Sequence, residues 1–295
     1  MSERVAVLGL GGMGSRLARR LVDGGCEVVV WNRTAARAEA AAAWGARPAA
    51  SPAEAARDAG LVVTMVADPA ALAAVTEGQD GALAGMREGS VLVEMSTVGP
   101  AAVARLREAA PPGVAAVDAP VLGSLSEADA GTLHVFVGGD APAVERCLPV
   151  LGLLGRPVVV GGPGAGAAAK LVANTTLVGV LTVLGEAMAV GRGLGLPDAV
   201  LFEVLARTPL AAQAERRRPA VESGEYPLRF ALGLAVKDAD LIRDAAAAAG
   251  VDVRMVEAAR SWFADAAGGG LAGADYSAVL AWILGRAGRA GAQAE

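Results

Sequence analysis

Short runs of apolar, mostly β-branched residues alternate with alanine-rich segments of helical period through the first half of the chain. The runs have the length of buried strands, and segments such as Gly12–Asp23 and Ala35–Trp44 have the period of helices. The predicted strands are Arg4–Leu8, Glu27–Trp31, Leu61–Met65, Ser90–Glu94, Ala115–Val117, Leu133–Val137 and Pro157–Val160. Strands that alternate with helices favour an α/β fold with a doubly wound, mostly parallel sheet.

The pattern changes after the glycine-rich run Gly161–Gly164. Beyond it we find no convincing strand, only apolar or amphipathic segments interrupted by glycine and proline. We therefore expect two domains, residues 1–162 and an all-helical domain of residues 163–295. The stretch Leu171–Val190 is long enough to cross a bilayer, but it contains Asn174 and Glu186 and lacks a basic flank, which favours a buried helix and no membrane partner.

Charge and cysteine content exclude several classes of function. The 295 residues carry a net charge of −5 without a block of like charges, so nucleic acid is not expected as a partner. Cys26 and Cys147 are too few and too far apart for a disulfide framework or a CxxC metal site, and no metal is expected. The N-terminus enters a strand without a signal-like segment, so we expect a cytoplasmic protein.

Lysine is scarce: of the 26 basic residues only Lys170 and Lys237 are lysine. A coding bias toward arginine would replace lysine wherever any cation suffices. The two lysines are therefore candidates for amine chemistry, because a lysine can give up its proton and an arginine cannot. Chance retention at a surface position stays open as the alternative.

The segment from Gly9 to Gly14 fits the GxGxxG pattern directly after the first predicted strand. In a dinucleotide-binding site the first glycine permits a tight turn, the second admits a pyrophosphate, and the third lets the helix approach the strand. The expected cofactor-binding residues here are Gly9, Gly11, Gly12, Met13 and Gly14. A glycine-rich turn without a ligand is the alternative.

The second predicted strand ends in Asn32, Arg33 and Thr34, where an NAD enzyme would place an acidic residue for the ribose. An amide, a guanidinium and a hydroxyl suit a 2′-phosphate, so NADP(H) is favoured over NAD. The alternative is that Thr34 only caps the next helix and Arg33 is solvated. Met65 and Val66 are also candidate cofactor-binding residues: Val66 and its neighbour Ala67 would contact the cofactor through the backbone, while a place in the core is the alternative for Met65.

Lys170 and Asn174 stand four residues apart in a helical stretch, which places them on one face. The residues between them are apolar, so burying this polar pair would be costly without a specific purpose. A lysine there can donate a proton to a carbonyl oxygen that receives hydride. A structural polar pair is the alternative.

With these residues the chain resembles the β-hydroxyacid dehydrogenase family along nearly its whole length. The resemblance rests on ordered segments: the glycine-rich fingerprint, Ser96–Val98, Asp118–Ser124, Gly131–Leu133, Gly164–Gly166 followed by Lys170 and Asn174, Phe230 with Lys237 and Asp238, and Asp275–Ala278. It implies a Rossmann-type domain, a helical second domain, a cleft between them, and a homodimer or homotetramer formed through the helical domain.

The resemblance also assigns roles. Lys170 would be the general acid in reduction and the base in oxidation, Asn174 would position the substrate, and Thr97 and Lys237 would contact the cofactor. Asp238 would support the hydrogen bonding of the lysine. The substrate-binding residues would be Leu122, Gly123, Ser124, Lys170, Asn174, Phe230 and Asp238.

Three departures from the family pattern leave the substrate open. Leu122 and Ala173 replace a serine and an asparagine, and Ser124 replaces a glycine and could restore a hydroxyl. The leading hypothesis is an NADPH-dependent reductase of small semialdehyde or keto acids. An imine reductase is the rival, since its relatives share a segment like Val30–Thr34, although they generally lack a lysine at position 170. A non-catalytic NADP-binding protein is the third possibility.

Overall fold

The structure, a computed structural model, describes residues 3–291 and consists of two compact units, Met1–Leu171 and Val172–Glu295. The division falls inside the long helix α9 (Ala165–Gly193), so the first turns of this helix belong with the sheet. The boundary expected at residue 162 falls just before α9 begins.

A nine-stranded sheet forms the centre of the first unit, with strand order β3-β2-β1-β4-β5-β6-β8-β7 and β9 paired with β8. Its strands are β1 (Arg4–Leu8), β2 (Glu27–Trp31), β3 (Arg47–Pro48), β4 (Leu61–Thr64), β5 (Val91–Glu94), β6 (Ala115–Asp118), β7 (Val121–Leu122), β8 (Leu133–Gly138) and β9 (Gly155–Gly161). β1 to β6 are parallel, and their order is that of a Rossmann-type domain. The predicted fold class is confirmed.

Every predicted strand is present, whereas β3 and β7 were not predicted. Each contains only two residues, too few to produce a recognisable alternation of apolar and polar positions. β8 runs antiparallel to both β6 and β7. The sheet is therefore parallel except at this side.

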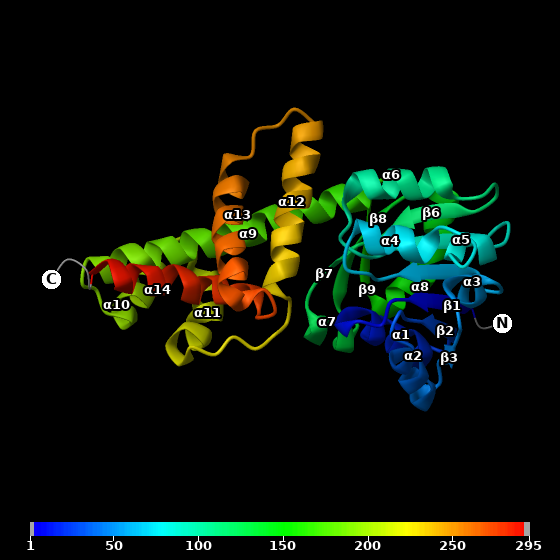
Figure 1. Cartoon of the computed structure of the whole chain (residues 1–295), viewed down its shortest axis with the longest axis horizontal. Helices are drawn as coiled ribbons and strands as arrows, with labels where there is room; N and C mark the ends of the chain where they lie inside the picture. Colours follow the sequence, from blue (N-terminus) through cyan, green and yellow to red (C-terminus); the bar gives the residue numbers. More distant parts are fainter. Residues whose placement is uncertain (1–2, 292–295) are drawn as a thin grey trace. The chain divides into compact units, whose positions relative to one another are not determined.

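Helices cover both faces of the sheet because alternate residues of each strand point to opposite sides. In β1, Val5 and Val7 enter one apolar core, whereas Ala6 and Leu8 enter the other. Figure 1 shows α4 and α6 on the opposite side of the sheet from α1 and α2. The helices of this unit are α1 (Gly12–Asp23), α2 (Ala35–Ala41), α3 (Pro52–Ala56), α4 (Pro69–Thr76), α5 (Ala82–Gly85), α6 (Gly99–Ala109), α7 (Leu125–Ala130) and α8 (Ala141–Leu154).

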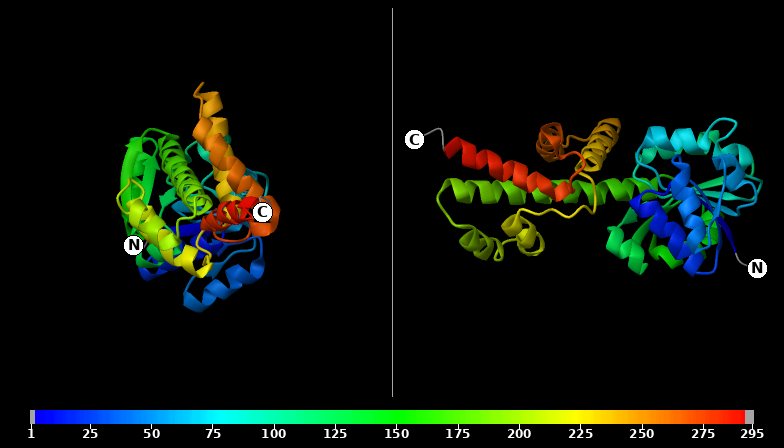
Figure 2. Two further views of the ribbon diagram at one scale, coloured as in Figure 1. Left: turned by 90° about the vertical axis from the view of Figure 1, so that its left-hand side faces the viewer. Right: turned by 60° about the horizontal axis from the view of Figure 1, so that its bottom comes forward.

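The second unit is helical, and in its described part the only strand-like pairing is one bridge between Ala231 and Asp275. Besides α9 it contains α10 (Asp198–Leu205), α11 (Ala211–Ser223), α12 (Leu232–Ala248), α13 (Arg254–Ala266) and α14 (Val279–Gly291). Helices α9 and α14 lie side by side (Figure 2), so closely that a Cβ on Gly185 would lie 2.7 Å from Ile283 Cδ1.

Helix α9 is the one helix in residues 3–291 that is long and apolar enough to cross a membrane by length and composition. Several of its apolar residues pack in the core of the second unit. Val178, Leu181, Leu184 and Met188 are at most 1% exposed and lie in the core of that unit. These positions form one face of the helix, as expected for packing against α14 and its neighbours.

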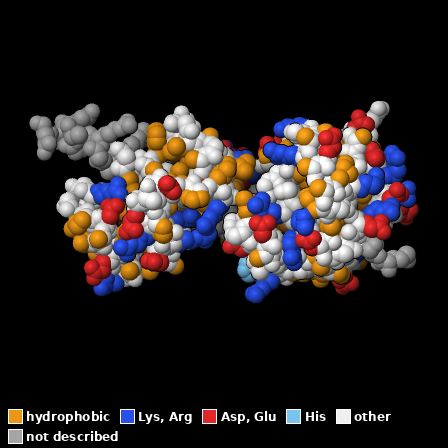
Figure 3. Space-filling model, turned by 90° about the horizontal axis from the view of Figure 1, so that it is seen from below, with side chains coloured by type: hydrophobic (Ala, Val, Ile, Leu, Met, Phe, Trp, Pro, Cys, Tyr) orange, Lys and Arg blue, Asp and Glu red, His pale blue; other side chains and the backbone are white. Residues whose placement is uncertain are grey.

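Basic and acidic side chains are interspersed on the surface of the first unit (Figure 3). Many of them form exposed ion pairs, such as Arg4 with Glu27 and Arg105 with Glu77. Exposed pairs of this kind contribute little to stability, because water and salt screen their attraction.

Two glycines determine how α9 meets the sheet. Gly164 has a φ of 85°, a left-handed conformation that favours glycine. A Cβ on Gly166 would lie 2.4 Å from the carbonyl oxygen of Phe136 and 2.5 Å from that of Asp118. Since both are backbone atoms of the sheet, the start of α9 can approach this closely only without a side chain.

We expect Gly166→Ala to destabilise the protein by about 1–3 kcal/mol, because the methyl group would force α9 away from β6 and β8. Gly179→Ala is the matched control on the same helix, where a Cβ would meet no atom within 4 Å. An alanine there should leave stability unchanged or raise it by up to ~1 kcal/mol. Urea unfolding followed by circular dichroism measures both, and coincident midpoints for the two variants would contradict the close approach.

Candidate active site

The glycine-rich turn after β1 has the geometry of a pyrophosphate site. Gly9 has a φ of 101°, and a Cβ on it would lie 2.3 Å from the Met65 carbonyl oxygen. A Cβ on Gly14 would lie 2.0 Å from the Gly9 carbonyl oxygen, so α1 packs directly on the turn. Around Gly11, by contrast, a Cβ would meet no atom within 4 Å, and no side chain caps the N-terminus of α1. Open space beside uncapped N–H groups fits an anion such as a pyrophosphate.

Residues of three neighbouring strands meet at the same edge of the sheet. Gly9 follows β1, Met65 follows β4, and Ser96 lies just beyond β5, while the strand order reverses between β1 and β4. In open α/β sheets, ligands bind at such a reversal, outside the carboxyl ends of the strands. The Val66 N–H donates to Ser96 Oγ at 2.8 Å, which ties the loop after β4 to the loop that carries Thr97.

A buried carboxylate organises this edge. Glu94, the last residue of β5, is 1% exposed and accepts hydrogen bonds from Thr64 Oγ1 and, at 2.5 Å, from the Ser96 N–H. The sequence analysis did not single out Glu94. A glutamate that ends an apolar strand was a visible signal, because buried acids in proteins are generally bonded to specific donors.

Of the three residues after β2, Asn32 has a structural role, whereas Arg33 and Thr34 have side chains that are not used inside the protein in this way. Asn32 Oδ1 accepts from the Leu10 N–H at 2.9 Å and Asn32 Nδ2 donates to the Thr34 carbonyl at 3.0 Å, so this amide holds the glycine-rich turn. Thr34 occupies the N-cap position of α2 without a side-chain capping bond. Arg33 is exposed, and no hydrogen bond or ion pair within residues 3–291 engages its guanidinium. Arg33 and Thr34 thus have side chains that could reach a ligand.

Asp118, the last residue of β6, fixes the start of α9. Its Oδ1 accepts from the Gly164 N–H at 2.8 Å and its Oδ2 from the Ala167 N–H at 2.7 Å. Burial raises the pKa of this carboxyl, while the backbone N–H groups oppose that rise. Lys170 follows one turn later on the same helix and is partly buried. The hydrogen bonds of Asp118 therefore set the position of Lys170 relative to the sheet.

Asn174, Lys237 and Asp238 form a polar cluster in the second unit. Asn174 is 2% exposed, and its Nδ2 donates to Asp238 Oδ2 at 2.6 Å. Lys237 Nζ lies 2.7 Å from Asp238 Oδ1. One buried carboxylate thus orients both an amide and an ammonium group. Asn174 lies one helical turn beyond Lys170 on α9, as the spacing predicts.

The segment before α12 is held by Asp275. Its Oδ2 accepts from the backbone N–H groups of Arg229 and Phe230 at 2.9 and 3.1 Å, and its Oδ1 accepts from Ser277 Oγ at 2.5 Å. The ring of Phe230 meets that of Tyr276 edge to face, with centroids 5.6 Å apart. Asp275 therefore positions Phe230 rather than facing a ligand itself.

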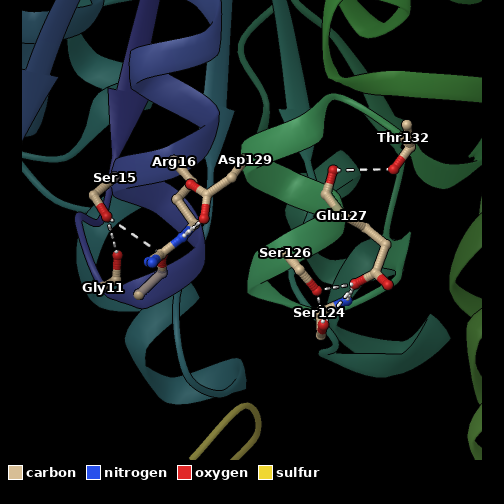
Figure 4. Close-up of polar contacts among 9 residues, drawn as sticks. Gly11, Ser15, Arg16, Ser124, Ser126, Glu127, Asp129 and Thr132 are labelled. Carbon is tan, nitrogen blue, oxygen red and sulfur yellow. Dashed lines mark hydrogen bonds and ion pairs between the residues drawn. The ribbon is translucent and has the colours of Figure 1, made fainter.

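The segment Leu122–Glu127 contains the expected substrate loop, and the side-chain hydroxyls of its two serines are already engaged (Figure 4). Glu127 Oε2 accepts from the Ser124 N–H at 2.8 Å, from Ser124 Oγ at 2.5 Å and from Ser126 Oγ at 3.0 Å. These bonds lower the pKa of Glu127 to about 2. The Ser124 hydroxyl, which the sequence suggested as a substrate ligand, is bonded within the protein instead.

This loop lies beside the glycine-rich turn. Leu125 Cδ2 is 3.5 Å from the position of a Cβ on Gly12. Arg16, on the first turns of α1, donates to the Gly12 carbonyl at 2.8 Å and forms an ion pair with Asp129 of α7 at 2.9 Å (Figure 4). The expected cofactor and substrate segments of the first unit are therefore adjacent.

Glu127 was also missed by the sequence analysis, although its signal was present. Ser124 followed three residues later by Glu127 is the pattern of a capping box, which the structure contains at the start of α7. Strand pairing also places His134 of β8 opposite Leu122, exposed at the surface. The pairing of His134 with Leu122, unlike the capping box, does not follow from proximity along the chain.

Family models cover most of the chain in two consecutive parts. The NAD binding domain of 6-phosphogluconate dehydrogenase matches residues 4–162. The family described as NAD-binding of NADP-dependent 3-hydroxyisobutyrate dehydrogenase matches residues 164–283. Both parts of the chain thus match families defined by nicotinamide cofactors.

Curated relatives and solved structures agree with these matches. The chain is 32% identical to glyoxylate/succinic semialdehyde reductase 2 of Arabidopsis thaliana, over 94% of this chain and 78% of the relative. It is 32% identical to an NAD-dependent L-serine dehydrogenase of Pseudomonas aeruginosa, over 94% and 96% of the two chains. The Mycobacterium tuberculosis 3-hydroxyisobutyrate dehydrogenase structure superposes with a TM-score of 0.85 at 29% identity, covering 96% and 99% of the chains.

The ordered motifs, the Rossmann-type sheet and these relatives lead to one conclusion. The resemblance identified from the motifs is confirmed. The chain belongs to the β-hydroxyacid dehydrogenase family and is an NAD(P)-dependent dehydrogenase or reductase that acts on CH–OH groups.

Proposed function

We propose that the chain is an NADPH-dependent reductase of short aldehyde and keto compounds, the class that contains the semialdehydes named for its relatives, with Lys170 as the proton donor. The observation that carries this proposal is the attachment of α9 to the sheet by Asp118. It holds a partly buried lysine in the same unit as the glycine-rich turn. An ammonium in such a place can serve proton transfer at neutral pH.

A bound NADPH would supply hydride to the carbonyl carbon. Lys170 Nζ would give its proton to the carbonyl oxygen, which completes the alcohol, and would take that proton back in the reverse reaction. Before transfer, the positive charge of Lys170 would stabilise the negative charge that develops on this oxygen. Glycines 9, 11 and 14 would admit the pyrophosphate, and the loops after β4 and β5 would border the nicotinamide.

Asn174 would orient the substrate. Its Nδ2 is fixed by Asp238, so its amide plane cannot rotate freely and its other polar atoms keep one direction. Asp238 also binds Lys237, the residue expected to contact the cofactor. We therefore regard Asp238 as a positioning residue that couples Asn174 to Lys237. Its predicted support of the catalytic lysine stays a prediction.

The preference for NADPH over NADH rests on the segment after β2. No acidic residue stands there to bind a ribose 2′-hydroxyl, and the exposed guanidinium of Arg33 suits a 2′-phosphate. Thr34 adds a hydroxyl that no capping bond engages. Asn32 contributes indirectly, because its side chain holds the Leu10 backbone rather than a ligand.

The oligomer expected from the family would use the helical unit. Several apolar side chains of this unit are exposed in the single chain, among them Val172, Val190 and Leu194, which are 62–77% exposed. Exposed apolar residues that gather on one element favour an interface.

We expect Arg33→Asp to weaken NADPH use and to spare NADH. Loss of a charge-assisted contact should cost about 1.5–3 kcal/mol, or roughly tenfold to a hundredfold in kcat/KM for NADPH. Arg57→Asp makes the same charge change at an exposed position between α3 and β4, before the amino end of β4. It should change kcat/KM for neither cofactor. Equal kcat/KM of the unaltered protein for both cofactors would contradict the proposed 2′-phosphate site.

We expect Lys170→Arg to lower kcat by ~10²–10⁴, because a guanidinium with a pKa above ~12 is too weak an acid to donate near neutrality. NADPH binding, followed by nicotinamide fluorescence, should change little. A nearly unaltered rate would show that only the charge of Lys170 is needed. A parallel loss of cofactor affinity would instead favour the structural alternative, in which Lys170 and Asn174 stabilise the fold.

A further inference from the structure

We propose that the segment Leu122–Glu127 excludes carboxylates, so that the physiological substrate presents an uncharged or amine-bearing end to this loop rather than an acid group. The inference rests on the proposed function, because it takes this loop as the wall of the substrate site. It narrows the substrate class to short carbonyl compounds without an anionic group at that end.

The first argument is that the serine hydroxyls of the loop are already engaged, so an incoming carboxylate would find no free side-chain donor there. The Ser124 N–H, the Ser124 hydroxyl and the Ser126 hydroxyl all converge on Glu127 Oε2, at 2.8, 2.5 and 3.0 Å. The side chain of Leu122, which begins the loop, contributes only carbon atoms. Glu127 thus engages these three donors with a carboxylate of the protein itself.

The second argument is charge. Glu127 stays ionised at every pH at which the enzyme would work, since its pKa is about 2. Within residues 3–291 no ion pair engages Glu127. The nearest cation known to touch α7, Arg16, is committed to Asp129 and to the Gly12 carbonyl. A substrate carboxylate beside Ser124 would therefore meet the negative charge of Glu127, which no ion pair among the described residues offsets.

The third argument is location. Leu125, between Ser124 and Glu127, packs on Gly12 of the cofactor turn. Gly123 has a φ of 143°, and a Cβ there would lie 3.1 Å from Glu127 Cβ. Glu127 therefore lies directly over the backbone of the loop and not on a remote part of the surface. An amine or a hydroxyl of the substrate could donate to the remaining lone pairs of its carboxylate.

The test compares two substrates of similar length that differ in charge: succinic semialdehyde and its neutral methyl ester. With NADPH at pH 8, the unaltered enzyme should show at least tenfold higher kcat/KM for the ester. Glu127→Gln keeps an acceptor for the Ser124 N–H but removes the charge, and should reduce this preference about tenfold, mainly through KM for the acid. Asp129→Asn removes the same charge from the same helix without touching Ser124, and should leave the preference unchanged.

A binding measurement separates this inference from the proposed function. Calorimetry of the NADP⁺ complex with 4-hydroxybutyrate and with 1,4-butanediol needs no turnover. If no carbonyl compound is reduced, the proposed function fails. The inference is then judged from binding alone: tighter binding of 4-hydroxybutyrate to Glu127→Gln than to the unaltered enzyme supports it, and equal binding overturns it. The inference is overturned if the unaltered enzyme prefers the acid. It is also overturned if Glu127→Gln changes neither the ester-to-acid ratio of kcat/KM nor the affinity for 4-hydroxybutyrate. The same holds if Asp129→Asn changes these two quantities as much as Glu127→Gln does.

Discussion

The contact between the Asp118 carboxylate and the first turn of α9 is the constraint on which the rest of the first unit's site depends. Two backbone N–H groups that would otherwise lack partners are satisfied by an acid at the end of β6. Because Gly166 has no side chain, the helix can come close enough for both bonds to form. The position of Lys170, one turn later on α9, therefore depends on this junction. A helix that began elsewhere would carry the same residues to a different place.

Carboxylates hold the neighbouring parts of the site in a similar way. Glu94 connects the ends of β4 and β5, Asp238 connects Asn174 to Lys237, and Asp275 holds the segment that carries Phe230. An ionised acid can accept several bonds at once, and charge-assisted bonds are stronger than neutral ones. The acids therefore orient other groups, and in the proposed mechanism an amine transfers the proton. This division explains how a chain with only two lysines can form the site.

Glu127 shows how one side chain can engage the donors of a neighbouring loop. The loop keeps the glycine that its backbone requires, with a φ of 143° at Gly123, so its course is preserved. Its donors, however, are consumed by a neighbouring side chain. Family membership thus indicates the hydride chemistry, whereas the proposed choice of end group depends on a few contacts in this loop.

The sequence by itself determined the fold class, the family and the two segments that carry the glycine-rich turn and Lys170, because periodicity, glycine spacing and helical spacing are local properties of the chain. Local pattern could not give the roles of Asn32 and Asp118, since each depends on a partner brought close by folding: Leu10 and the start of α9. The short strands β3 and β7 were missed for the same reason, because only pairing with β2 and β8 makes them strands. The sequence shows which polar groups are present, but only the tertiary structure decides which remain free to bind a ligand, because a donor bonded inside the protein is no longer available to a substrate.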